Sequence, residues 1–155
     1  MAADTIREKI MANIETAITA ITIANGYNRT IESVQRWKQS GNTFSNVPCV
    51  IIGAGAEVFE DRPGFLTSCK LPVMLDLWIV HDENVDVIST DALLNIFLGD
   101  IKKALMTDYT RGGYAVTTRI QNAIPFETTE GQPYAGMIIT TEIEYRHNTL
   151  DPTQQ

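Results

Sequence analysis

The chain has 155 residues, of which 44% are hydrophobic and 20% charged, a composition that excludes collagen, coiled-coil and largely disordered proteins. Nineteen acidic residues against twelve basic ones give a net charge of −7, which argues against tight wrapping of nucleic acid. Neither a stretch long enough to span a bilayer nor a basic segment leading into an apolar one is seen, so we expect a soluble protein without an export signal.

The first predicted element is an amphipathic helix. Asp4 or Thr5 is expected to cap it, and Asn25-Gly26 to end it. Its apolar residues recur every three or four positions and form one stripe: Ile6, Ile10, Ile14, Ala17, Ile18 and Ile21. Each buried isoleucine contributes about 1.5–3 kcal/mol, so we expect the helix to lie on a sheet.

Strands follow the helix. Residues 27–38 predict one irregular strand, and residues 40–46 an exposed loop. The segments CVIIGAGAEVFE and FLTSCKLPVMLDLWIVH flank DRPG and predict a long hairpin, with Pro63 and Gly64 at the centre of a type II turn. Pro72 stands near the entry of a central strand. One face of that strand is apolar through Val73, Leu75, Leu77 and Ile79, and the other holds Met74, Asp76, Trp78 and Val80.

A second helix is predicted after residue 88, capped by Ser89 or Thr90. Its expected buried stripe is Leu93, Leu94, Phe97, Ile101 and Leu105. Its expected exposed residues are Asp91, Asp100, Lys102 and Lys103.

Two antiparallel strands are predicted to close the sheet. The first alternates through Tyr114, Val116, Thr118 and Ile120. In the second strand, five alternating residues share one face: Met137, Ile139, Thr141, Ile143 and Tyr145. Residues 148–155 are expected to be an unanchored, flexible tail, which leaves residues 1–147 as a single domain.

The pattern predicts an α+β fold with a mixed, mainly antiparallel sheet of about five strands. Two helices are expected mainly on one face, together with a long β-hairpin. The other face must then meet either water or another subunit.

The stretch VIIGAGAEV, residues 50–58, raises the question of a dinucleotide site. That fingerprint needs a third glycine, where this chain has Val58, and a helix beginning inside the motif, whereas Pro63-Gly64 follow within a few residues. An acidic residue at a suitable distance, Asp76, lies inside the predicted central strand. We therefore interpret Gly53 and Gly55 as strand glycines that permit a bulge or a close backbone approach.

Other patterns give no catalytic, cofactor or metal prediction. Residues 81–86 carry His81 and three carboxylates but lack the glycine and terminal glutamate of a calcium loop. His147 has no second histidine near it in sequence. Cys49 and Cys69 lack CxxC spacing and are expected to be buried thiols. We expect a protein that is not an enzyme.

Several phrases in order resemble the tail-terminator, or tail-completion, proteins of long-tailed bacteriophages. They are ITIANGYNRTIESVQRW after the first helix, GAE after an apolar strand, LPVMLDLWIV, IKKALMTDYTRGGYAV, and the closing IITTEIEYRHNTLDP. The ending resembles the family's tyrosine-arginine pair followed by Asp-Pro. The resemblance covers nearly the whole chain.

This resemblance implies a hexameric ring that caps the finished tail tube, stops its polymerisation and presents a surface to the head connector. The implied partners are further copies of the chain, the tail tube protein and the connector proteins. DNA passes through the lumen without specific binding, and no membrane is involved. The location is the head-proximal end of the virion tail, after assembly in the host cytoplasm. Neighbouring subunits would cover the bare sheet face, in a ring that closes only if the rotation fits.

By the same analogy, subunit and tube contacts are expected on the hairpin turn and on two loops. The residues are Arg62, Pro63, Gly64 and Phe65, with Asn42, Phe44, Tyr109 and Arg111. Charge reversal at Arg62 and Arg111 is then expected to weaken assembly without unfolding the monomer. The alternatives are another ring-forming virion component, either a head-tail stopper or a tail-tube subunit, and a small nucleotide-binding domain. A host adaptor domain is a further alternative.

Overall fold

The computed structural model describes residues 3–37, 46–82, 84, 87–126 and 133–155. These form two α-helices, a short 3-10 helix and six strands: α1 (Ile6–Thr19), η1 (Ile23–Asn25), β1 (Ser33–Arg36), β2 (Cys49–Ala54), β3 (Val58–Arg62), β4 (Leu66–Val80), α2 (Thr90–Thr107), β5 (Ala115–Pro125) and β6 (Tyr134–Asn148). The predicted α+β class with a mixed, mainly antiparallel sheet is confirmed.

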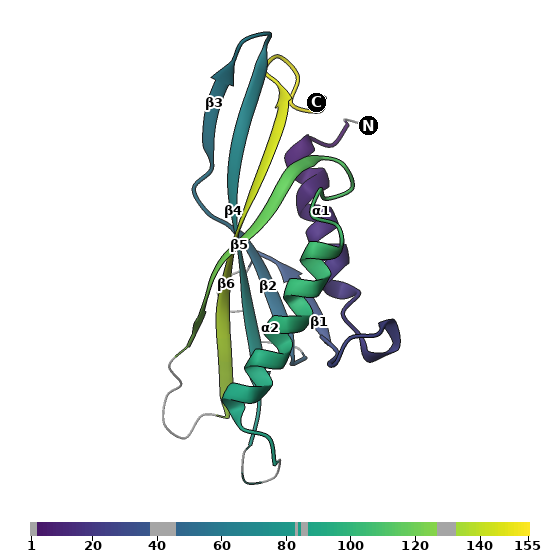
Figure 1. Cartoon of the computed structure of the whole chain (residues 1–155), viewed down its shortest axis with the longest axis vertical. Helices are drawn as coiled ribbons and strands as arrows, with labels where there is room; N and C mark the ends of the chain where they lie inside the picture. The colour runs from purple at the N-terminus through teal and green to yellow at the C-terminus, as the bar shows by residue number, and fades with distance from the viewer. Residues whose placement is uncertain (1–2, 38–45, 83, 85–86, 127–132) are drawn as a thin grey trace.

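The sheet is ordered β1-β2-β4-β6-β5, and β3 pairs with the part of β4 that β2 leaves free. Only the β1–β2 pair among these is parallel. Both helices lie on the same side of the sheet, and the β3–β4 hairpin projects at one end of the molecule (Figure 1). The hairpin and the helix layer are therefore two distinct parts of the surface.

The long strands β4 and β6 form the centre of the fold. They pair along their whole length, from Leu66 opposite Asn148 to Val80 opposite Tyr134. Strict alternation puts the predicted faces of both strands on the helix side, where Leu71 joins them. These positions are all buried: Leu71, Val73, Leu75, Leu77 and Ile79 of β4, and Met137, Ile139, Thr141, Ile143 and Tyr145 of β6. Because these strands are continuous, they carry the hairpin as a rigid extension of the core.

The first helix is capped by Thr5, whose hydroxyl accepts from the Glu8 N–H at 3.1 Å. It ends at Thr19, six residues before the predicted stop at Asn25-Gly26. The Thr22 side chain caps a separate 3-10 turn, η1, and Gly26, at φ +85°, ends that turn instead. The predicted helix end is therefore wrong, because a competing local cap begins a new turn.

The predicted first arm of the hairpin is two strands. β2 pairs with residues 73–78 of β4, and β3 pairs with residues 66–70. Between them the Gly55 N–H donates to the Pro72 carbonyl at 2.8 Å, and a Cβ on Gly55 would lie 3.2 Å from the Pro72 Cβ. The expected close approach is confirmed for Gly55, whereas Gly53 has open space around it. Pro72 lies at this changeover, in the middle of β4, so its predicted place near the entry of the strand is wrong. Its missing N–H is tolerated there because it falls between the segments that pair with β2 and β3.

The strand predicted over residues 27–38 is only Ser33–Arg36. Asn28 and Arg29 are held by α2 instead: the Asp100 carboxylate accepts from the Asn28 N–H at 3.2 Å, the Asn28 side chain at 2.8 Å and the Arg29 N–H at 2.9 Å. Asp100 is 1% exposed, so its prediction as an exposed residue is wrong. The residues of the predicted buried stripe of α2 are all buried, and Ser89 caps the helix as one of the two predicted caps.

The edge strand β5 contains two irregularities in its pairing with β6, between residues 115 and 117 and between residues 120 and 122. The first turns Val116 outward, and the side chain is exposed. Ala115 and Thr118 are buried in its place. The predicted alternation through Val116 is therefore wrong, since one extra residue in a strand reverses the facing of what precedes it.

The last eight residues are anchored, so the expectation of a free tail is not met. The Ile6 N–H donates to the Pro152 carbonyl at 2.9 Å, and the Thr149 N–H to the Phe65 carbonyl at 2.7 Å. The Gln155 side chain donates to the Tyr114 carbonyl at 2.8 Å. The C-terminal segment thus joins the start of α1 to the hairpin.

Candidate interaction surface

The projecting hairpin carries four of the predicted interface residues, and all of them are exposed. Every residue of β3 is exposed as well, including Val58 and Phe59. Gly64 has φ +84°, as the third residue of a type II turn requires, and Phe65 follows at φ +58° with 65% of its surface exposed. A bulky residue in the left-handed region is uncommon, so Phe65 is held outward at a conformational cost.

The base of the hairpin is fixed by Glu57, which lies between β2 and β3. Its carboxylate accepts a hydrogen bond from the Tyr145 hydroxyl of β6 and pairs with the Arg7 Nε of α1 at 3.1 Å. Only 9% of the Glu57 side chain is exposed. Burial, with the Glu57 contact, raises the pKa of Tyr145 far above its ordinary value. Helix, sheet and hairpin therefore share one partly buried polar junction.

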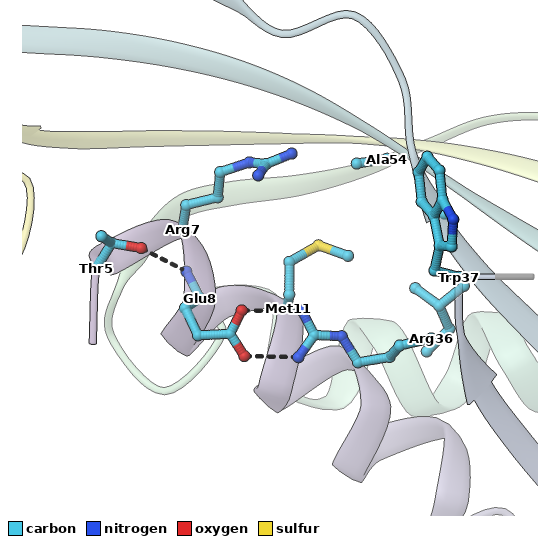
Figure 2. A pocket seen from close by; sticks show the side chains of 9 residues that line it. Thr5, Arg7, Glu8, Met11, Arg36, Trp37 and Ala54 are labelled. Carbon is cyan, nitrogen blue, oxygen red and sulfur yellow. Dashed lines mark hydrogen bonds and ion pairs between the residues drawn. The ribbon is translucent and has the colours of Figure 1, made fainter. Parts of the chain in front are cut away.

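A pocket of about 360 Å³ opens between the first half of α1 and the ends of β1 and β2 (Figure 2). Its apolar lining includes Met11, Ile52 and Ala54, with Trp37 standing at one side. Trp37 is 71% exposed and has φ +62°. Its backbone N–H donates to the Ile52 carbonyl at 2.9 Å. A tryptophan so exposed and so constrained is a candidate contact residue.

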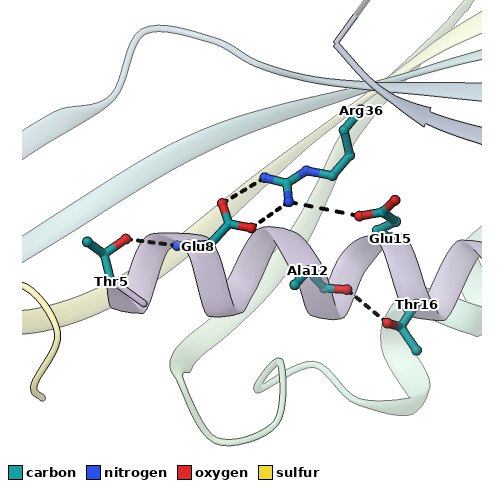
Figure 3. A network of polar contacts seen from close by, with 6 residues as sticks. All are labelled: Thr5, Glu8, Ala12, Glu15, Thr16 and Arg36. Carbon is teal, nitrogen blue, oxygen red and sulfur yellow. Dashed lines mark hydrogen bonds and ion pairs between the residues drawn. The ribbon is translucent and has the colours of Figure 1, made fainter. Parts of the chain in front are cut away.

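Charged groups border the same pocket. The Arg36 guanidinium donates to both carboxylate oxygens of Glu8, at 2.6 and 2.9 Å, and lies 3.9 Å from Glu15 (Figure 3). The hydrogen bond from Arg36 lowers the pKa of Glu8, and the same contact raises the pKa of Arg36. This bidentate pair ties α1 to β1 and keeps Arg36 at the pocket rim.

The sheet face opposite the helices is only partly covered. Met74, Asp76 and Ile138 are half-buried there and line a hollow of about 310 Å³ that Trp37 also borders. Further along, the Phe126 ring lies over Trp78, with ring centroids 4.7 Å apart. The predicted apolar content of this face is present, and it adjoins the Trp37 pocket.

Two predicted loop contacts have different outcomes. Tyr109, after α2, is exposed. Arg111 is 0% exposed, and its guanidinium donates to the carbonyls of Leu105 and Asp108. Its prediction as a surface contact is therefore wrong, because the cation binds the carbonyl end of α2. The remaining two, Asn42 and Phe44, lie outside the described residues.

Titratable and nucleophilic side chains are dispersed. Cys49 and Cys69 are not joined in a disulfide and are buried as predicted, and burial raises the pKa of the Cys69 thiol. His81 contacts the Ile88 carbonyl at 2.6 Å. The described residues hold no cluster of three side chains suited to a metal ion, and no helix there has the length and apolarity to cross a membrane. The glycines of VIIGAGAEV are followed by the strand β3, whereas the glycines of a dinucleotide-binding fingerprint are followed by a helix.

Sequence reasoning missed Trp37 and Glu57. Trp37 counted there only as one apolar residue of an irregular strand, although a tryptophan next to a polar loop is a signal for a surface contact. Glu57 entered only as the last residue of the GAE phrase, and its contacts were not predictable because its partners Arg7 and Tyr145 are distant in sequence. Compared with known proteins, the chain matches no family model and no curated protein sequence.

Proposed function

We propose that this protein is a tail terminator of a long-tailed phage. It assembles as a closed ring, hexameric by the resemblance, on the end of the tail tube. The ring stops tube polymerisation and forms the joining surface for the head connector. No bond is made or broken in this role, and the chemistry is that of fitted surfaces.

The observation that carries the proposal is the projecting, exposed hairpin on a rigid base. Its strand β3 shows Val58 and Phe59 to solvent, and its turn shows Phe65. An isolated two-stranded ribbon is marginally stable, but this one continues from the central strand β4 and is fixed through Glu57. An exposed ribbon that presents these apolar side chains among charged ones and is held in one orientation is suited to docking on another protein.

Two further features support the proposal. The sheet face away from the helices keeps Met74 and Ile138 half-exposed, as expected of a face that a neighbour covers. The net charge of −7 suits a lumen through which DNA slides, since like charges oppose binding. The resemblance in the phrases quoted above supplies the identity of the tube as partner.

The test is an arrest assay with tail-tube subunits that polymerise in solution. Adding the protein is expected to halt growth at a stoichiometry of one ring per tube end, and the protein alone is expected to form no filament. Indefinite filaments of the protein itself would instead identify a tube subunit. Undiminished tube growth at saturating protein would contradict the proposal.

A variant sharpens the assay. Arg62 is exposed at the hairpin, where it pairs with Glu60 at 3.2 Å. Arg62→Glu is expected to weaken arrest of tube growth while the melting temperature stays within about one degree of the wild-type value. Lys70→Glu, a charge reversal at another exposed residue of the hairpin, is the matched comparison. If Arg62→Glu arrested tube growth as well as the wild type does, Arg62 would not be part of the surface that contacts the tube.

A further inference from the structure

The pocket beside Trp37 is a hollow and the tip of the hairpin is a projection of the same molecule. The pocket has a volume of about 360 Å³ and an apolar lining. The hairpin projects from one end of the molecule (Figure 1), and Phe65 at its turn is 65% exposed. A phenyl side chain buries an area that such a pocket can cover.

Charged groups of both signs border the two surfaces. The pocket is lined by Arg7, Arg36 and Glu8, and Arg36 is already paired with Glu8. Strand β3 exposes Glu60, Asp61 and Arg62, of which Arg62 pairs with Glu60. Arg7 is 48% exposed although it contacts Glu57, so a contact between Arg7 and the exposed Asp61 of a partner is open, and an apolar centre with a polar rim is usual in protein interfaces.

Both aromatic anchors are also backbone outliers. Trp37 at φ +62° and Phe65 at φ +58° are two of the three non-glycine residues with positive φ among those described, and both are exposed. The third, Arg111, is buried and satisfies the end of α2. Such strain persists where the surrounding structure enforces it, and it clusters at sites of contact and function.

A chain cannot place its own tip in its own pocket. Ala54, at the pocket, pairs with Val73, and Phe65 lies eight residues before Val73 along the same strand direction. At the rise of an extended strand this is a separation of about 26 Å. Head-to-tail contact between different patches of successive copies is what a ring requires.

We propose that the pocket beside Trp37 receives the hairpin tip of a second copy of this chain, with Phe65 as the side chain that enters it. The inference rests on the proposed ring and names the two halves of its subunit contact. Phe59 is a poorer candidate for entry, because it lines a hollow within its own protomer together with Arg7, Glu57 and Tyr145.

Cysteine cross-linking tests the contact directly. The variant with Ala54→Cys and Pro63→Cys keeps Phe65, because Pro63 is an exposed neighbour at the same turn. It is expected to give, on mild oxidation, a ladder of covalent multimers beyond the dimer. Mixing the two single variants is expected to stop at a dimer. The native cysteines are 0% exposed and stay in every variant. The matched control pairs Pro63→Cys with Ile124→Cys, at an exposed site on the opposite edge strand, and a comparable ladder from it contradicts the assignment.

Glycine substitutions separate this role from a structural one. Trp37→Gly and Phe65→Gly relieve the positive-φ strain, so the melting temperature of the monomer is expected to equal or exceed the wild-type value. Each is nonetheless expected to weaken assembly at least tenfold, and the double variant no more than either single one. Wild-type assembly by Trp37→Gly contradicts the proposal.

The outcomes also separate the two proposals. Rings on tube ends without the cross-link ladder contradict the pocket assignment and leave the terminator function in place. A ladder confined to adducts with the tube protein assigns the pocket to the tube and contradicts occupation by a second copy. A protein that stays monomeric with and without tubes contradicts both proposals.

Discussion

Arg111 is a buried cation whose partners are the last carbonyls of α2. The Leu105 and Asp108 carbonyls accept from one guanidinium nitrogen, while Nε and Nη1 have no partner within the described residues. Burial lowers the pKa of Arg111, because the charged form has lost water. Arg111 therefore stabilises the folded chain, and we expect its replacement to lower the free energy of unfolding.

Charge reversal distinguishes this buried arginine from the exposed one. Arg111→Glu is expected to lower the free energy of unfolding by about 3 kcal/mol or more, because it places a carboxylate against carbonyl oxygens. Arg62→Glu is expected to change it by less than about 0.5 kcal/mol. Urea unfolding followed by tryptophan fluorescence measures both. Similar values for the two variants would contradict the burial of Arg111.

Asp100 is the second buried charged residue, and it holds the segment after η1 against α2. Asp100→Ala leaves the backbone N–H groups of Asn28 and Arg29 without their acceptor, so the free energy of unfolding is expected to fall by about 2 kcal/mol or more. Asp91→Ala, on the exposed side of the same helix, is expected to cost less than about 1 kcal/mol. Equal losses in thermal melts would contradict the proposed role of Asp100.

Spacing alone would have placed Asp100 correctly. It stands three residues after Phe97 and four before Ala104, both buried, so it lies in the stripe that the helical period defines. The prediction failed because charge was given more weight than period. Arg111 had no such signal, since binding to helix carbonyls depends on how the chain turns after α2.

At the scale of elements, the long strands and helices were predictable from the sequence, and the junctions between strands were not. The alternation of β4 and β6 and the stripes of both helices were predictable, because each repeats a period over many residues. The split between β2 and β3 depends on one contact, between Gly55 and Pro72, and the outward turn of Val116 on one extra residue. Single-residue events of this kind leave no periodic trace.

Gly136 offers a test of how closely β4 and β6 approach. A Cβ at this position would meet the Phe126 ring and lie 2.5 Å from the Leu77 carbonyl oxygen. Gly136→Ala is expected to lower the free energy of unfolding by about 1–3 kcal/mol, as overpacking does. Gly53→Ala, in a strand with open space around it, is the control and is expected to be close to neutral. Calorimetry that ranks the two variants in the opposite order would contradict this packing.

The tie between α1 and β1 predicts a pH dependence. The folded-state pKa of Glu8 is lowered, chiefly by the hydrogen bond from Arg36. Its contribution to stability is therefore present above the ordinary glutamate pKa and is lost as the pH falls through the lower folded-state value. The pair is partly exposed, so the contribution is below about 1 kcal/mol.

The measurement compares melting temperatures of wild type and Glu8→Gln across this range. The wild type is expected to melt higher at neutral pH, with the difference vanishing at acid pH. Glu32→Gln, at an exposed carboxylate, controls for net charge and is expected to show no such difference. A gap between wild type and Glu8→Gln that persists unchanged into acid would contradict the assigned contact.

At the scale of the molecule, the sheet has a covered face, a partly bare face and a projecting hairpin. The fold class follows from the order of periodic segments. The interaction surface does not, because its pocket brings Trp37 and Arg7 together from separate parts of the sequence. We propose that the partner of this pocket is the hairpin tip of another copy of the same chain.

Electron microscopy of the purified protein, alone and mixed with tail tubes, tests this central claim most directly. The predicted result is an annular particle of fixed subunit number seated at tube ends, with no tube extending beyond it. Tube ends left bare at saturating protein, or protein distributed along the tube wall, would contradict the account.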